Sequence, residues 1–224
     1  MPDWTPQQVE LFTTIIWWLF ALIVVLIFYR PIRDHVFPRL SSFSAMGVEF
    51  SLVRDSINAA IETANKRDIK LAEKSTKWNV EVPEENKELV VDRAKRNASI
   101  LRGVQILWVD DCPENNKNEL KMFRQLQIDV RTVTDTQSAV QLLQEHSDQH
   151  PYDIVLSDMA RGDEPSAGLS LLAELANMNV QPPVIFYVGV IDPTKGVPPQ
   201  AFGLTNRPDE LLHLVIDALE RVKR

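Results

Sequence analysis

The chain has 224 residues, a net charge of −7 at pH 7 and 45% hydrophobic residues, a length that allows one large domain or two small ones. Residues 1–102 hold 14 Lys and Arg against 13 Asp and Glu, whereas residues 103–224 hold 10 against 18. Binding to nucleic acid needs clustered Lys and Arg, so an acidic C-terminal half without a basic patch argues against a nucleic-acid partner. The one cysteine, Cys112, excludes a disulfide framework and a cysteine-based zinc site.

An uncharged stretch of 19 residues, 11–29, follows a short N-terminal segment, residues 1–10. A helix of about 20 residues crosses a hydrocarbon core of about 30 Å, so we expect residues 11–29 to form a transmembrane helix. No Lys or Arg precedes the stretch, whereas Arg30, Arg33 and Arg39 follow it. The positive-inside rule therefore predicts a single-pass protein of the inner (plasma) membrane, with residues 1–10 outside and the C-terminal domain in the cytoplasm.

Two alternatives to this anchor are a cleavable signal peptide and a buried core helix. A signal peptide would need a basic region before the apolar stretch and a small-residue cleavage site after it, and Arg30-Pro31-Ile32-Arg33 stands where that site would be. The sequence therefore favours a retained anchor.

Residues 30–102 are predicted to form a cytoplasmic helical linker. Within residues 43–64, apolar side chains recur at alternating steps of three and four, at Phe43, Met46, Phe50, Val53, Ile57, Ala60 and Ala64. This spacing is typical of a coiled coil and would support a parallel homodimer, but it equally fits one amphipathic helix that packs on its own chain. A second helix is expected from Pro83 to about Leu101, where Gly103 ends it.

Residues 103–224 alternate short apolar runs with helical patterns, which predicts a flavodoxin-like, doubly wound parallel five-stranded sheet with helices on both faces. The first run, residues 104–109, ends on Asp110 and Asp111, and a later run, residues 152–157, ends on Asp158. The carboxyl ends of neighbouring strands share one crevice in such a sheet. Converging carboxylates repel one another, so we expect a cation there, and Mg²⁺ prefers oxygen ligands of this kind.

The fourth crossover helix of this pattern is expected to be missing or reduced to a turn. Residues 190–200 contain four helix breakers, namely Pro193, Gly196, Pro198 and Pro199.

From Gly103 to the C-terminus, the chain resembles the receiver domain of two-component response regulators. In that family an acid pair follows the first strand and the phosphoacceptor aspartate follows the third, and the matching positions here are Asp110, Asp111 and Asp158. The resemblance implies a magnesium ion at these three acids, phosphorylation on Asp158, and a protein partner such as a histidine kinase or a downstream effector.

The chain departs from the family at the two positions that respond to the phosphoryl group. Val188 stands where receivers have a Thr or Ser, and Asn206 stands at the best match for their lysine. Arg207, the next residue, is a candidate phosphate contact, because a guanidinium binds phosphate well. The loop after Asp158 is also longer and more acidic than is usual for the family.

These departures favour a membrane-tethered pseudo-receiver that acts through protein contacts and keeps its acidic metal pocket. The first alternative is a functional response regulator phosphorylated on Asp158. The second is a ligand-binding or phosphatase-like enzyme of flavodoxin-like fold. No P-loop, dinucleotide fingerprint or nucleophile elbow is present in the sequence, so we do not expect an enzyme.

Overall fold

The computed structural model describes residues 17–18, 50–66, 82–145, 152–178, 181–192 and 194–222. The chain divides into two compact units, Met1–Val48 and Glu49–Arg224, and everything described below belongs to the second. Apart from Trp17 and Trp18, the predicted span over residues 11–29 lies outside the described residues. Among the residues that are described, no helix combines the length and the apolar character needed to cross a bilayer.

The second unit is built on a five-stranded parallel sheet with the strand order β2-β1-β3-β4-β5, which confirms the predicted sheet. Its strands are β1 (Gln105–Val109), β2 (Asp129–Val133), β3 (Ile154–Ser157), β4 (Val184–Tyr187) and β5 (Gly203–Thr205). β3 and β4 are buried along their whole length, and β1 is buried from its second residue on. Strands covered on both faces require the near-continuous apolar runs that the sequence contains.

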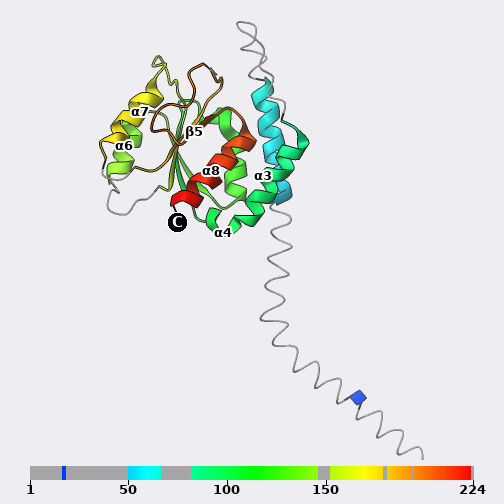
Figure 1. Cartoon of the computed structure of the whole chain (residues 1–224). Helices are drawn as coiled ribbons and strands as arrows, with labels where there is room; N and C mark the ends of the chain where they lie inside the picture. Colours follow the sequence, from blue (N-terminus) through cyan, green and yellow to red (C-terminus); the bar gives the residue numbers. More distant parts are fainter. Residues whose placement is uncertain are drawn as a thin grey trace, which may run out of the picture. The chain divides into compact units, whose positions relative to one another are not determined.

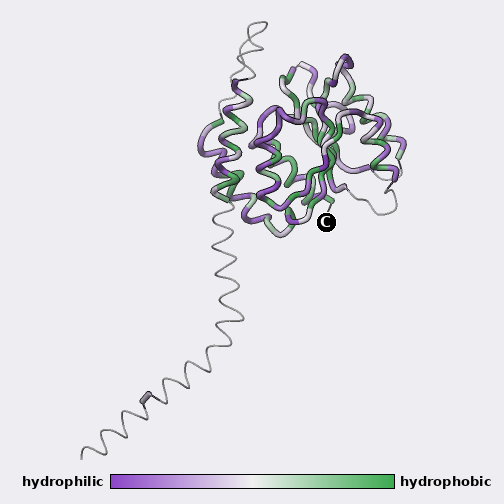
Figure 2. Tube along the Cα trace, turned by 180° about the vertical axis from the view of Figure 1, so that it is seen from behind, coloured by the Kyte–Doolittle hydropathy of each residue, from purple (hydrophilic) through white to green (hydrophobic). Residues whose placement is uncertain are grey.

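Helices cover both faces of the sheet (Figure 1). α6 (Thr136–Glu145) and α7 (Ala167–Ala176) pack together on one face, while α5 (Lys117–Gln125) and α8 (Pro208–Val222) cover the other. A short 3-10 turn, η2 (Pro113–Asn116), precedes α5. Figure 2 shows the most hydrophobic segments gathered in the central strands, with hydrophilic residues on the outer helices.

The crossover between β4 and β5 contains no regular helix over the described residues 188–192 and 194–202, which confirms the expectation from its prolines and glycines. Ile191 and Ala201 of this segment pack against the apolar cluster under α6 and α7. Val190 and Val197 are exposed. An irregular loop therefore covers the part of this face where a fourth helix would lie.

The linker forms an outer layer of helices against α5 and α8. It comprises the helix 50–66, α3 (Glu84–Arg96) and α4 (Ala98–Leu101). The single helix expected from Pro83 to Leu101 is interrupted at Asn97, whose side-chain amide donates to the carbonyl oxygen of Arg93 at 3.1 Å and ends α3 there. Gly103 then adopts a φ of +74° and turns the chain into β1.

The helix 50–66 buries its apolar stripe on its own chain. Val53, Ile57 and Ala60 are fully buried, and Phe50 is 5% exposed. Ser56 donates a hydrogen bond to Gln125 of α5. The heptad-like pattern was compatible with a coiled coil or with an amphipathic helix packed on its own chain, and the structure contains the second of these.

Candidate functional site

A cavity of about 230 Å³ opens at the carboxyl ends of the strands. It brings together three predicted acids and both predicted switch positions with residues from the linker and from the loop before α5. The lining residues are Ala64, Asp110, Asp111, Cys112, Asn115, Asn116, Asp158, Tyr187, Val188, Gly189 and Asn206. We call this site the acidic pocket.

Asp110 is fixed within the acidic pocket by two neighbouring donors. It is 7% exposed. Its Oδ1 accepts from the backbone N–H of Cys112 at 2.7 Å, and its Oδ2 accepts from the Asn116 side chain at 2.6 Å. These two bonds hold the Asp110 carboxylate in a defined orientation at the pocket.

Asp111 points to the loop that follows Asp158. The side chain of Asp111 is exposed, and its Oδ2 accepts from the backbone N–H of Gly162 at 2.8 Å. Gly162 has a φ of +54° and lies between Arg161 and Glu164, whose backbones bond to each other. Asp111 thus connects the loop after β1 to the tip of the loop after β3.

The surroundings of Asp158 oppose its ionisation. Burial raises its pKa to about 6, and the charges of Asp110 and Asp111 act in the same direction. Its Oδ1 accepts from the backbone N–H of Met159 at 2.7 Å, which offsets part of this effect. The Asp111 carboxylate likewise raises the pKa of the neighbouring Cys112 thiol. A cation in the pocket would relieve this repulsion.

The chemistry of the lining suits Mg²⁺, since carboxylate and amide oxygens are the ligands that it prefers. However, across the described parts of the chain, no three His, Cys, Asp or Glu side chains lie close enough together to hold a metal ion. Asp110, Asp111 and Asp158 line the same pocket but are not close enough to one another to bind a metal ion together. The magnesium site therefore stays a prediction.

The two positions that respond to the phosphoryl group in receivers, here Val188 and Asn206, both line the acidic pocket. Val188 is 8% exposed and belongs to the apolar cluster of the sheet. Asn206 lines the pocket at the end of β5. Arg207, the candidate phosphate contact, is not among the lining residues; both Nε and Nη2 of its guanidinium donate to the Asp209 carboxylate. The structure therefore does not bring Arg207 to the site.

Tyr187 is a pocket residue that the sequence analysis missed. Its hydroxyl donates to Oε1 of the buried Glu119 of α5 at 2.7 Å, and its ring packs edge-on against Trp108 at 5.9 Å. An aromatic residue at the end of an apolar strand gives no sign of such a bond, because Glu119 lies 68 positions earlier. The wall of the pocket is thereby tied to α5.

Arg161 is the second missed residue, and it is only 6% exposed. Its guanidinium donates to the Ser157 hydroxyl at 2.6 Å and to the Asp158 carbonyl at 2.8 Å. It also donates to the Thr136 hydroxyl and the Ala167 carbonyl, both at 2.7 Å. Burial lowers its pKa. These four bonds attach the loop after Asp158 to β3, α6 and α7. The sequence did not indicate this role, because arginine is rarely buried.

Comparison with known families agrees with this geometry. Residues 106–197, the segment that holds Asp110, Asp111 and Asp158, match the response regulator receiver domain. The match runs from the second residue of β1 into the loop after β4, so the linker, β5 and α8 lie outside it.

Several solved structures are similar to the chain. The response regulator PhyR from Brucella abortus is 23% identical, with 77% of this chain and 68% of that chain covered and a TM-score of 0.46. A receiver domain protein from Clostridium thermocellum is 20% identical, with 54% and 97% covered and a TM-score of 0.45. The receiver domain of Francisella response regulator 1452 is 20% identical, with 54% and 99% covered and a TM-score of 0.43. No curated protein matches the chain.

Proposed function

We propose that the chain is a membrane-tethered signalling module whose receiver domain, residues 103–224, works as a pseudo-receiver through protein contacts. The observation that carries this proposal is the composition of one cavity. Val188 and Asn206 line it together with Asp158, so the two positions that would respond to a phosphoryl group offer no aliphatic hydroxyl and no ammonium charge.

The energetic argument concerns what a phosphoryl group on Asp158 would gain. A ligand shifts a conformational equilibrium only by its differential affinity for the two states. A hydrogen bond to a charged group contributes about 1.5–3 kcal/mol, and inverting a two-state population takes about 5.5 kcal/mol. Without the hydroxyl and the lysine, most of this differential affinity is lost, and the two remaining carboxylates, Asp110 and Asp111, would repel the phosphoryl group.

The acidic pocket is proposed to retain a cation site. Asp110, Asp111 and Asp158 would hold Mg²⁺, which would neutralise part of their charge when bound. The chain's own part is to present the three carboxylates at one edge of the sheet, with Asp110 held by Cys112 and Asn116. The protein partner would be a histidine kinase or a downstream effector that reads the surface of the receiver domain.

The test is an amide and methyl NMR spectrum of the full chain in detergent micelles with magnesium, before and after adding beryllofluoride as a phosphoryl mimic. A pseudo-receiver gives shifts confined to residues near Asp111 and Asp158. Shifts that spread through Val188, the 189–202 segment and β5 would show a working switch and refute the proposal.

A functional phosphoacceptor is the second candidate, and the meeting of the three acids in one cavity favours it. Labelling with acetyl phosphate decides whether Asp158 accepts a phosphoryl group, and Asp158→Asn is the control. Continuous release of phosphate from small phosphate esters, lost in Asp158→Asn, would instead indicate a phosphatase-like enzyme.

A further inference from the structure

The helix 50–66 is held on α5 by polar contacts as well as apolar ones. Ser56 donates to Gln125 at 3.0 Å, and the Asn118 side chain donates to the Thr63 hydroxyl at 3.0 Å. Ser56 is 2% exposed and Ile61 is 6% exposed. The docked stripe is therefore wider than the a and d positions of a heptad, as expected for a helix that packs on a globular domain.

The same helix carries the coiled-coil pattern, with Phe50, Ile57 and Ala64 at a positions and Val53 and Ala60 at d positions. All of these except Ala64 are buried in the docked helix. Because one face cannot pack on α5 and on a second copy at once, the two arrangements exclude each other. We propose that the helix 50–66 is a two-state element, docked on α5 in one state and paired in parallel with a second copy of this chain in the other.

The docked state also carries a cost, which makes the second state accessible. The side-chain oxygens Oδ1 of Asn58 and Asn65 are buried and find no hydrogen-bond partner among the described residues. Both residues occupy b positions of the heptad, which face solvent in a coiled coil. Pairing would hydrate both oxygens, whereas it would partly expose Ile61 and Ser56. Opposing terms of this kind are what a bistable element requires.

The docked helix ends at the acidic pocket, where Ala64 forms part of the lining and Thr63 bonds to Asn118, three residues after Asn115 of the same lining. A ligand in the pocket meets this helix only in the docked state. Since coupling between two sites is reciprocal, occupancy of the pocket changes how often the helix is released. This step rests on the proposed function, whereas the exclusion between docking and pairing does not.

Disulfide crosslinking of the full chain in lipid vesicles measures the paired state. In a Cys112→Ser background, which removes the chain's one cysteine, Val53→Cys places a thiol at a d position. Identical d residues face each other in a parallel dimer, whereas Val53 is fully buried in the docked state. We expect little crosslinking in this parent protein.

Ser56→Arg breaks the docked state and spares the pairing face, because a g position tolerates charge. We expect the crosslinking yield to rise by about fivefold or more over the parent, because destabilising the docked state shifts the two-state equilibrium toward the paired state. The neighbouring Asp55→Arg is the control: it introduces the same side chain at an exposed f position, and crosslinking should stay at the parent level.

Gln125→Arg disrupts the same docked contact from the α5 side and leaves the sequence of the helix 50–66 unchanged. It therefore tests the proposal even if Ser56→Arg prevents the helix 50–66 from forming. Crosslinking that stays at the parent level in Gln125→Arg overturns the two-state proposal. For the pocket, magnesium with beryllofluoride should change the parent's crosslinking yield. If the parent's yield stays unchanged while crosslinking rises in Gln125→Arg, the pocket is not coupled to the helix. The two-state proposal for the helix would then still hold.

Discussion

Single residues decide how tightly the acidic pocket is framed. Gly168 in the first turn of α7 donates its N–H to the Met159 carbonyl at 2.9 Å. A Cβ there would lie 2.6 Å from the Phe186 ring and 2.8 Å from the Asp158 carbonyl oxygen. The backbone that carries Asp158 therefore packs against a position that only glycine fits.

Gly168→Ala should destabilise the domain of residues 103–224 by roughly 1–3 kcal/mol, the usual cost of overpacking a well-packed site. Chemical denaturation followed by circular dichroism measures this change. Gly189→Ala is the matched control, because a Cβ at Gly189 meets nothing within 4 Å. Equal stability of the two variants would mean that the α7 turn adjusts more easily than the close contacts imply.

Magnesium should raise the thermal stability of the full chain by binding the native state. At saturating concentrations the gain is expected to be about 1–3 kcal/mol, and Asp111→Asn should abolish it. Sodium chloride at matched ionic strength controls for screening of the pocket's charges. A magnesium response that survives in Asp111→Asn would exclude Asp111 from the site.

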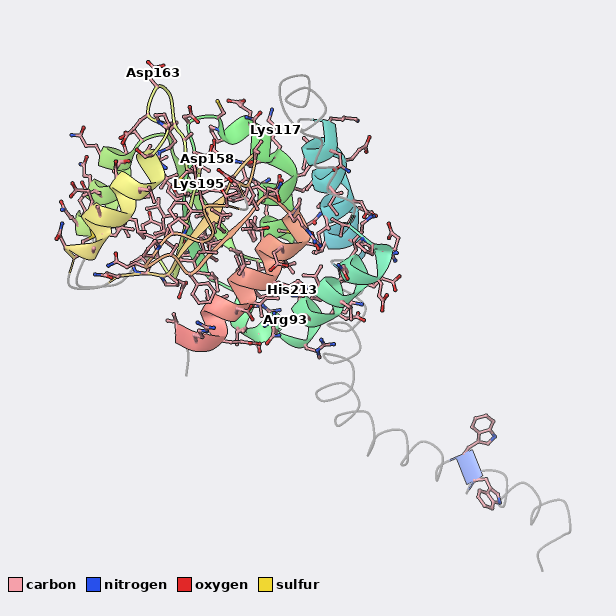
Figure 3. The ribbon with its side chains drawn as sticks, turned by 45° about the horizontal axis from the view of Figure 1, so that its top comes forward. Arg93, Lys117, Asp158, Asp163, Lys195 and His213 are labelled. Atoms are coloured by element: carbon pink, nitrogen blue, oxygen red, sulfur yellow. The ribbon has the colours of Figure 1, made fainter. Side chains whose placement is uncertain are left out.

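At the scale of elements, α3 is fastened to α8 by a charged cluster. Arg93 of α3 donates to Asp217 at 2.5 Å and to Glu220 at 3.1 Å, and it lies 3.3 Å from Nδ1 of His213. Figure 3 shows Arg93 and His213 next to each other between the two helices. Burial, and then the positive charge of Arg93, lower the pKa of His213.

This cluster makes the docking of α3 sensitive to pH. The folded chain holds His213 neutral, so the contribution of His213 to stability is fully present above its ordinary pKa of about 6.5 and is lost as the pH falls below that value. We expect the protection factors of the α3 amides, which correct the measured hydrogen exchange for its intrinsic pH dependence, to fall as the pH is lowered from 7.5 to 5.5. His213→Gln should remove this fall; if the variant keeps it, another group is responsible.

Much of the fold follows from local patterns, and the exceptions are long-range contacts. The runs that end at Asp110 and Asp158 were sufficient to place β1 and β3 and to predict that their acids meet. The docked state of the helix 50–66 could not be chosen over a coiled coil, because the choice depends on Gln125 and Asn118 far along the chain. The Tyr187–Glu119 bond was missed for the same reason, whereas Arg161 was missed because an arginine is rarely buried.

For the whole molecule, the central prediction is a single-pass anchor that holds the C-terminal domain, residues 103–224, at the cytoplasmic face of the membrane. A reporter that works only in the cytoplasm should be active when it is fused after Arg224. The chain should also resist extraction from membranes with alkaline carbonate. Recovery of the full-length chain in the soluble fraction would refute the anchor, and an exported reporter would reverse the orientation.

The missing helix between β4 and β5 has a consequence for proteolysis. Lys195 lies in that crossover with 81% of its side chain exposed, and Figure 3 shows it on the loop rather than on a helix. Proteases cut exposed loops that open locally at little cost. Within residues 82–222, brief treatment with trypsin should therefore cleave first after Lys195. The fragment that follows carries α8, whose buried face and bonds to Arg93 would keep it attached, so the nicked protein should elute from a sizing column as one species and separate only in denaturant.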